Sequence, residues 1–269
     1  MPGVASGRLH NDAWLCNAAG SPSSHRSDRA VAHRLAIVGA SGYGGAELLR
    51  LADAHPALEV AVVAAHSQAG TRVAELFPNL PGDRVFDAID VDQLRGCDVV
   101  VLGTPHAAAI ELGAELTDAG TKVVDLSAAF RLSPTGFTTW YGEDHPAPQL
   151  TAADAGLAPR PGGAVYGLPE LVDADGTPQR ERIATATLVA NPGCYVTTAL
   201  LGLAPLAPLV EPGSVIVDGK SGTSGAGRAA SDRLHFAHVH ASVGAYAAPD
   251  VMGAGGTVTP RSSASSSSA

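Results

Sequence analysis

The sequence contains few cysteines and no concentrated basic segment, and each shortage excludes a class of protein. Three cysteines, Cys16, Cys97 and Cys194, are too few and too scattered for a disulfide framework, and no CxxC pair suggests a zinc site. We therefore expect a cytoplasmic protein without a bound metal. A net charge of -9 with no Lys/Arg cluster argues against a nucleic-acid or anionic-membrane surface, so the expected partner is a small molecule.

Long apolar runs are also missing. No segment is apolar for long enough to span a bilayer. Residues 1–32 lack the apolar core of a secretory signal; their Arg and Ser leave an organelle transit peptide open, but their acidic residues favour a disordered extension or an overlong gene start. Residues 251–269 are rich in Ser without any strand or helix period, which predicts a disordered tail.

The middle of the chain alternates apolar runs with helical patterns. Helices are expected over residues 46–54 and 107–119, and loops over the Pro-, Gly- and Asp-rich residues 133–175. Buried strands that alternate with helices predict an α/β fold, a Rossmann-type doubly wound parallel sheet over residues 33–190. The runs expected to form its strands are residues 35–38, 59–65, 97–103 and 122–126.

A second region is expected to follow, the incomplete start of an α+β catalytic domain over residues 191–250. It would begin with a helix from Tyr195 to about Leu206, ended by Pro205 and Pro208. A strand is expected over residues 214–218, followed by a glycine and serine loop over residues 219–227. No internal repeat is present.

Cys194 lies at the start of the predicted helix of this second region, in the sequence Asn191-Pro192-Gly193-Cys194. Asn191 is a good N-cap residue, and proline suits the first helical position. The unpaired N–H groups and positive dipole end of a helix stabilise a thiolate, which is the attacking species. Cys194 is therefore a candidate nucleophile; the alternative is a small buried hydrophobic residue.

A glycine turn with GxxGxxG spacing follows the first predicted strand and opens a helix. In that context its backbone N–H groups and the helix dipole can face a pyrophosphate, although a turn chosen only for tight strand-to-helix packing would look the same. The expected cofactor-binding residues are the four glycines of the turn and two hydroxyl residues: Gly39, Ser41, Gly42, Tyr43, Gly44 and Gly45.

The second predicted strand indicates which dinucleotide binds. A free ribose 2′-hydroxyl usually meets an Asp or Glu at that strand's end, but here the strand runs into His66 and Ser67. Ser67, with Arg72 beyond it, suits a 2′-phosphate, so the sequence prefers NADP to NAD. The competing interpretation is an ordinary polar loop.

Six motifs follow one another along the chain: GASGYGGAEL (39–48), DLSAAFRL (125–132), WYGEDHPAP (140–148), YGLPEL (166–171), NPGCY (191–195) and KSGTSGAGR (220–228). In this order they resemble the N-acetyl-gamma-glutamyl-phosphate reductase family, within the aspartate-semialdehyde dehydrogenase superfamily. The resemblance covers residues 34–249.

The resemblance implies NADPH-dependent reduction of N-acetyl-glutamyl 5-phosphate, an acyl phosphate, to the 5-semialdehyde in arginine biosynthesis. Cys194 would carry the acyl group as a thioester. Arg131, Lys220 and Arg228 are the available cations for phosphate or carboxylate, or else surface charges and loop-pinning donors. The second glycine loop would lie near the nicotinamide, and its expected cofactor contacts are Ser221, Gly222, Ser224 and Gly225.

The chain departs from the family pattern beyond Pro249. The family continues with an HRHxPEI-like segment that supplies a histidine acid/base and then with strands that form its subunit interface; neither follows here. His235, His238 and His240 precede that position and are poor replacements, and His106 is expected near the cofactor. We expect a truncated or frameshifted chain with impaired turnover and a missing oligomer interface.

Three alternatives stay open at this level. The chain can be a reductase that acts on aspartyl phosphate instead. It can also be a non-catalytic nucleotide-binding fragment or degenerate paralogue, or a nucleotide-binding module whose cysteine is redox-active or structural. The last predicts slow alkylation of Cys194 at neutral pH.

Overall fold

The structure is a computed structural model and describes residues 32–80, 82–153, 161–173 and 176–244. The expected disordered segments are residues 1–32 and 251–269, and apart from residue 32 they lie outside this range. Among the described helices, none has the length and apolar character that a membrane span requires.

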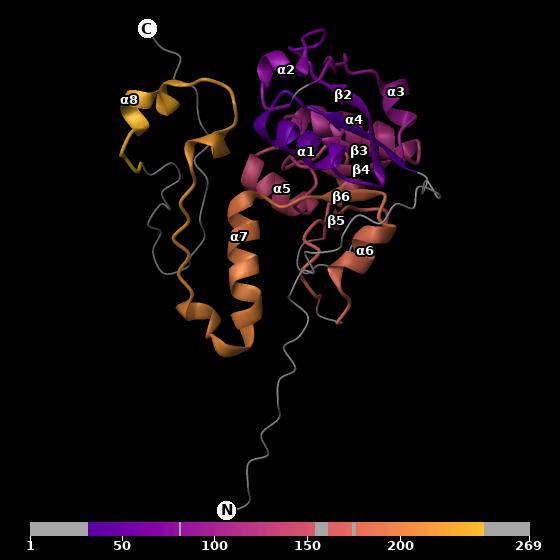
Figure 1. Ribbon diagram of the computed structural model, residues 1–269. Coiled ribbons are helices and arrows are strands. Elements are labelled where there is room, and N and C mark those ends of the chain that lie inside the picture. Colours follow the sequence, from indigo (N-terminus) through magenta and orange to yellow (C-terminus); the bar gives the residue numbers. More distant parts are fainter. Residues whose placement is uncertain (1–31, 81, 154–160, 174–175, 245–269) are drawn as a thin grey trace, which may run out of the picture. The chain divides into compact units, whose positions relative to one another are not determined.

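A six-stranded parallel sheet organises the chain as far as residue 190 (Figure 1). Its strand order is β2-β1-β3-β4-β6-β5, so the chain leaves β1 toward one side of the sheet and returns to place β3 on the other. The predicted α/β, Rossmann-type sheet is confirmed. The strands are β1 (His33–Val38), β2 (Leu58–Ala64), β3 (Val99–Leu102), β4 (Lys122–Asp125), β5 (Val165–Tyr166) and β6 (Leu188–Ala190).

Helices α1 (Tyr43–Asp53), α2 (Val73–Leu76), α3 (Val91–Arg95), α4 (His106–Asp118), α5 (Pro134–Tyr141) and α6 (Gln179–Thr185) lie between the strands in sequence. Among them, α1 and α4 pack on opposite faces of the sheet. Helices α7 (Cys194–Leu203) and α8 (Phe236–Val239) follow the last strand (Figure 1). Short 3-10 turns lie at Pro148–Leu150, Ala204–Leu209, Pro212–Ser214, Thr223–Ala226 and Asp232–Leu234.

The core lies in two layers because successive strand residues point to opposite faces. Ala36 and Val38 of β1 belong to the layer that α4 covers, which includes Leu116 of that helix. Leu35 and Ile37 belong to the layer that α1 covers. A sheet buried on both faces needs strands that are apolar throughout, which is why the strand runs do not alternate with polar residues.

The loop expected over residues 133–175 contains regular structure, so that expectation was wrong in part. Ser133 caps α5 by accepting a hydrogen bond from the N–H of Gly136, and Pro134 occupies the first turn. Gly142 ends the helix in the left-handed region at φ 76°. The start and stop residues of a helix are therefore present in the sequence, and β5 follows further on.

The strand expected over residues 214–218 does not form, and the chain there has no regular structure beyond the 3-10 turn that ends at Ser214. Ile216 is 93% exposed, and none of the strands in the described ranges pairs with this segment. Apolar β-branched residues favour a strand only where a sheet is present to pair with them. From Cys194 to Gly244, no side chain that the structure describes is buried.

Candidate active site

Backbone hydrogen bonds join the loops at the carboxyl ends of four adjacent strands. The N–H of Gly103, after β3, donates to the carbonyl of Val38 at the end of β1 (2.8 Å). The N–H of Asn191, after β6, donates to the carbonyl of Asp125 at the end of β4 (2.8 Å). Ligands of open α/β sheets bind at the carboxyl ends of the strands. The glycine turn and the segment that carries Cys194 both lie at this edge.

The glycine turn between β1 and α1 is packed against the turn after β3. Gly39 has φ 83°, and a Cβ there would lie 2.3 Å from the carbonyl oxygen of Gly103. A Cβ at Gly45 would lie 2.6 Å from Cα of Ala40, whereas one at Gly44 would meet nothing within 4 Å. Gly39 and Gly45 are thus required by packing, and Gly44 leaves open space for a ligand.

The first turn of α1 also leaves backbone donors free. In the described part of the chain, the N–H groups of Tyr43, Gly44 and Gly45 have no hydrogen-bond partner. Gly42 is the N-cap and has no side chain to consume them, and Ser41 and the half-exposed Tyr43 flank it. Free N–H donors at the positive end of a helix of this length suit a phosphate group.

A buried hydroxyl beside the glycine turn supports the same fit. The Oγ1 atom of Thr104, directly after Gly103, is buried and has no hydrogen-bond partner among the described residues. An unpaired buried hydroxyl is costly unless a ligand or water satisfies it. Sequence reasoning missed Thr104; its position after the third apolar run, next to the first strand, was the available signal.

The loop after β2 places Ser67 on the surface at the same edge of the sheet. Arg72 instead pairs with Asp83. The structure also adds a carboxylate that the sequence did not indicate, because Asp87 runs alongside β2 and accepts the N–H of Val63 at 2.9 Å. One oxygen of the Asp87 carboxylate is therefore used to hold the backbone of β2.

Cys194 is exposed and is the first residue of α7, which confirms its predicted placement at a helix start. The N-cap is Gly193 and not Asn191, so that expectation was wrong. The backbone of Asn191 is held by the sheet edge and its side chain donates to the carbonyl of Pro192 (3.1 Å). Because no side chain caps α7, the N–H groups of Cys194 and Val196 keep no partner within the described residues.

Arg131 lies beside this helix start and pins two loops. Its Nε donates to the carbonyl of Asn191 and its Nη2 to that of Leu126, both at 2.7 Å. A Cβ at Gly193 would lie 3.2 Å from its Nη1. The loop-pinning role considered for Arg131 is therefore what the geometry shows, with Nη1 directed at the residue before Cys194.

Two ionisable groups lie near Arg131. Burial raises the pKa of the Asp125 carboxyl, while hydrogen bonds from the N–H and hydroxyl of Ser127 and the charge of Arg131 act against that rise. Burial also raises the pKa of the Tyr166 hydroxyl, again opposed by Arg131. The cation thus compensates buried groups on β4 and β5 as well as pinning the backbone.

The second glycine loop spans the distance between α7 and the glycine turn. At its start, a Cβ on Gly219 would lie 2.7 Å from the ring of Tyr195, the residue after Cys194. At its end, Nε of Arg228 donates to the carbonyl of Ser41 at 2.8 Å. Residues 219–228 therefore connect the segment that carries the thiol to the glycine turn. The two residues of the second contact, Ser41 and Arg228, are 187 positions apart in sequence.

The remaining predicted residues of this loop are exposed. The Ser221 hydroxyl donates to the carbonyl of Gly222 and would lie 2.4 Å from a Cβ at Gly225. Ser224 belongs to the 3-10 turn at Thr223–Ala226, which follows Gly222. Lys220 forms an ion pair with Asp218, so its charge is compensated locally.

None of the described histidines has a recorded contact with Cys194. His106 begins α4, with its Nε2 3.9 Å from a carboxylate oxygen of Glu143. His145 is buried and neutral: its Nδ1 accepts the N–H of Ala147 while its Nε2 donates to the carbonyl of Ala129. His235 and His238 are exposed and bond only to neighbouring backbone.

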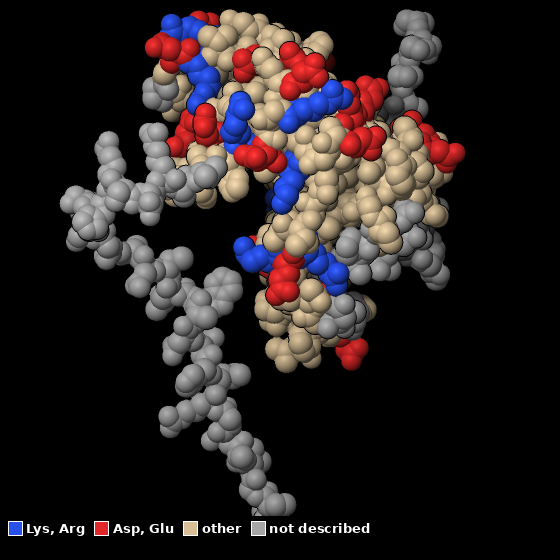
Figure 2. Space-filling view, turned by 90° about the vertical axis from the view of Figure 1, so that its right-hand side faces the viewer, with Lys and Arg blue, Asp and Glu red and all other residues tan. Residues whose placement is uncertain are grey.

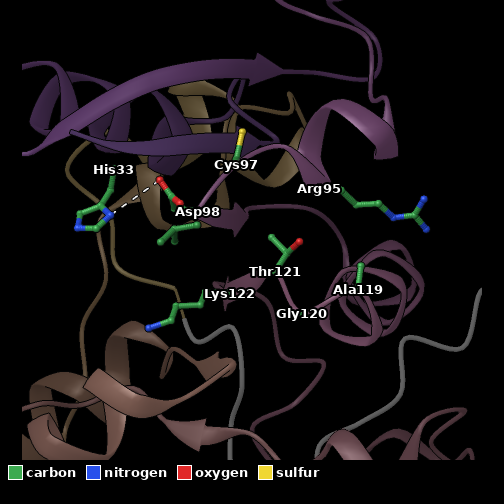
Figure 3. Close-up of a pocket in the computed structure, with 9 residues that line it drawn as sticks. His33, Arg95, Cys97, Asp98, Ala119, Gly120, Thr121 and Lys122 are labelled. Atoms are coloured by element: carbon green, nitrogen blue, oxygen red, sulfur yellow. Dashed lines mark ion pairs between the residues drawn. The ribbon is translucent and has the colours of Figure 1, made fainter. Parts of the chain in front are cut away.

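A cavity of about 500 Å³ opens at the opposite edge of the sheet, where the strands begin (Figure 3). His33 and Asp98 lie side by side in its lining, with 3.8 Å between Nδ1 of His33 and a carboxylate oxygen of Asp98, while Arg95 extends away from them. Burial raises the pKa of the Cys97 thiol in its wall. This cavity is remote from the carboxyl edge and contains none of the predicted site residues.

Surface charge is mixed. On the face in Figure 2, the described Lys and Arg side chains lie among Asp and Glu and form no extended basic patch. No group of three His, Cys, Asp or Glu side chains that could hold a metal occurs in the described ranges.

A family model for the NAD-binding domain of semialdehyde dehydrogenase matches residues 34–176, which include the glycine turn. The chain belongs to the semialdehyde dehydrogenase family. A second model of that family, its dimerisation domain, matches residues 194–250, which begin at Cys194. Residues 34–176 of this semialdehyde dehydrogenase chain are thus a nicotinamide-dinucleotide-binding domain, and the family match does not distinguish NADP from NAD.

Curated relatives carry a more specific name. The chain is 48% identical over 219 residues to an N-acetyl-gamma-glutamyl-phosphate reductase of Ectopseudomonas mendocina (strain ymp), covering 79% of the chain and 59% of the relative. It is 46% identical over 220 residues to the enzyme of that name from Pseudomonas aeruginosa (strain UCBPP-PA14), with 80% and 59% covered. The chain thus spans about 59% of the length of these relatives.

Solved structures of lower similarity also match. Aspartate semialdehyde dehydrogenase II from Vibrio cholerae, complexed with ASA, matches with a TM-score of 0.44 and 14% identity, over 66% of this chain and 43% of that one. A match of this extent adds nothing to the family assignment, which rests on the sequence models.

Proposed function

We propose that this chain forms the nucleotide-binding and thiol-bearing part of an NADPH-dependent N-acetyl-gamma-glutamyl-phosphate reductase. The substrate would be N-acetyl-glutamyl 5-phosphate and the products the 5-semialdehyde and phosphate, a step of arginine biosynthesis. The names of the curated relatives support this substrate. The observation that carries the proposal is the loop of residues 219–228, which contacts Tyr195 at one end and Ser41 at the other.

The chemistry assigned to Cys194 follows from its exposure at the start of α7. Its thiolate attacks the acyl carbon, a C–S bond forms, the C–O bond to phosphate breaks and inorganic phosphate leaves. The N–H groups of Cys194 and Val196 at this helix end have no partner among the described residues and lie beside the thiol. Arg131 holds the backbone of Asn191 and so keeps the turn before Cys194 in place.

The dinucleotide, when bound, supplies the hydride that converts the Cys194 thioester to an aldehyde and releases the thiolate. The residues assigned to hold it are the turn from Gly39 to Gly45, with Thr104 beside it and Ser221 to Gly225 from the second loop. Ser67, exposed at the end of β2, is assigned to the 2′-phosphate, which favours NADPH over NADH.

The test runs the reaction in reverse. Purified chain is mixed with phosphate, NADP and either N-acetylglutamate semialdehyde or aspartate semialdehyde, and NADPH is followed at its absorbance. NADPH formation with the acetylated substrate, absent in Cys194→Ser, supports the proposal. Formation with aspartate semialdehyde instead indicates an aspartyl enzyme, and replacement of NADP by NAD without loss of rate contradicts the cofactor assignment.

One observation favours a second candidate function. Among the described residues, no histidine contacts Cys194, so no proton-transfer partner for the thiol is in place. A non-catalytic nucleotide-binding chain would bind NADPH and turn over neither semialdehyde. Rapid, selective alkylation of Cys194 at neutral pH would separate an activated thiol from a merely structural or redox one.

A further inference from the structure

Arg228 is an arginine without an acidic partner that lies against the glycine turn. Its Nε donates to the carbonyl of Ser41, and no carboxylate within the described ranges forms an ion pair with it. Five of the ten arginines in the described ranges pair with Asp or Glu: Arg50, Arg72, Arg84, Arg95 and Arg182. Arg228 keeps its charge available beside the turn.

The contact also leaves most of the guanidinium free. Nε uses one of the five N–H donors, and Nη1 and Nη2 have no hydrogen-bond partner among the described residues. The neighbouring backbone N–H groups of Tyr43, Gly44 and Gly45 are free as well. The second glycine loop thus brings an arginine with free donors to Ser41, a residue of the first glycine loop, whose own free N–H groups begin two residues later.

We propose that Arg228 is a cofactor-binding residue that joins the two glycine loops around the pyrophosphate of the dinucleotide. The inference rests on the proposed function, because it needs a nicotinamide dinucleotide in the turn at Gly39 to Gly45. The bond from Nε fixes the Ser41 peptide. The planar fork of Nη1 and Nη2 then adds a positive charge and further hydrogen bonds to a phosphate oxygen, beside those from the backbone N–H groups.

This role differs from the one that sequence reasoning considered for Arg228. A cation near the end of the second glycine loop suggested a partner for the phosphate or carboxylate of the substrate. The contact with Ser41 places it at the first glycine turn, which lies within the residues that the NAD-binding domain model matches. Arg228 should therefore govern affinity for the dinucleotide and not the choice between semialdehydes.

The test measures nucleotide affinity of the full chain by NADPH fluorescence and calorimetry, in wild type and in Arg228→Met. Loss of a charge-assisted hydrogen bond predicts at least about a tenfold weaker NADPH affinity. Arg228→Lys, which keeps the charge but not the fork, should recover part of the loss. Arg233→Met is the matched control, an exposed arginine of the same segment, and should bind NADPH as wild type does.

A second ligand locates the effect. Adenosine 2′-monophosphate lacks the pyrophosphate, so its affinity should be equal in wild type and Arg228→Met. Equal losses for both ligands would mean that the variant merely disturbs the turn, and would overturn the inference. Unchanged NADPH affinity in Arg228→Met would overturn it alone, whereas a wild-type chain that binds no NADPH would overturn the proposed function with it.

Discussion

Helices α4 and α7 are both apolar, but their surroundings differ. α4 lies on the sheet and buries Ala109, Ile110 and Leu116. α7 is the more apolar of the two, yet none of its residues is buried, and the same holds for the described side chains that follow it to Gly244. Burial is therefore decided by a second layer of structure to pack against and not by residue type alone.

The comparison separates stability from chemistry along the chain. Residues 33–190 bury a core on both faces of the sheet and carry the glycine turn. Residues 194–244 carry the thiol and the second glycine loop, bury none of their described side chains, and reach the glycine turn through the bond from Arg228 to Ser41. Segments with few buried apolar contacts open at low free-energy cost, so the thiol-bearing part should be the less stable one.

Matched leucine truncations in the two helices give the largest expected contrast. Leu116→Ala in α4 removes a fully buried side chain and should lower the free energy of unfolding by about 2–5 kcal/mol. Leu201→Ala in α7, where the side chain is 41% exposed, should change it by less than about 0.5 kcal/mol. Both are read from urea denaturation. An equal cost at Leu201 would show that α7 is packed in the folded protein, and the comparison would fail.

Two glycines of the turn sharpen the comparison at the cofactor site. Gly39→Ala forces an L-residue to φ 83° and drives its Cβ into the Gly103 carbonyl, so it should cost about 2–4 kcal/mol of stability. Gly44→Ala, whose Cβ would meet nothing, should stay within about 0.5 kcal/mol. Thermal unfolding followed by circular dichroism compares the two. A tolerated Gly39→Ala would contradict the close approach of the two turns.

The pH dependence of stability gives a smaller contrast, between a buried and an exposed histidine. Burial lowers the pKa of His145, so the unfolded chain binds a proton that the native state resists. Stability should be full above pH 6.5 and fall as the pH drops below it, by at most about 1.4 kcal/mol per pH unit. His145→Gln should remove part of this slope, while His240→Gln, at an exposed position, should not. Identical slopes in wild type and His145→Gln would refute the assignment.

Most of the sheet could be predicted from sequence because its strands are continuous apolar runs separated by helical patterns. The glycine turn could also be predicted, because its glycines follow a strand and open a helix. The structure shows why two of them are needed: a Cβ at Gly39 or Gly45 would collide with neighbouring backbone. The prediction of a strand at residues 214–218 was wrong. Its apolar residue types favour a strand, but none of the described strands lies beside them to pair with. Propensity describes a segment, whereas pairing depends on what the rest of the chain brings to it.

The site was predictable in its parts but not in its connections. Cys194 was placed at a helix start from four letters of sequence, although the cap proved to be Gly193 because the sheet edge holds Asn191. The unpaired hydroxyl of Thr104 and the contact of Arg228 with Ser41 join residues from separate elements. No local pattern encodes such contacts, since they arise only when the strands and loops are assembled.

The most direct test of a shared site for thiol and nucleotide is protection of Cys194 from alkylation. Iodoacetamide labelling is followed by peptide mass spectrometry with and without saturating NADPH, and Cys97, a buried thiol whose pKa is raised, serves as the slow internal reference. We predict rapid labelling of Cys194 that slows several-fold when NADPH is bound, with Cys97 unaffected. An unchanged labelling rate at Cys194 while NADPH is demonstrably bound would contradict the account.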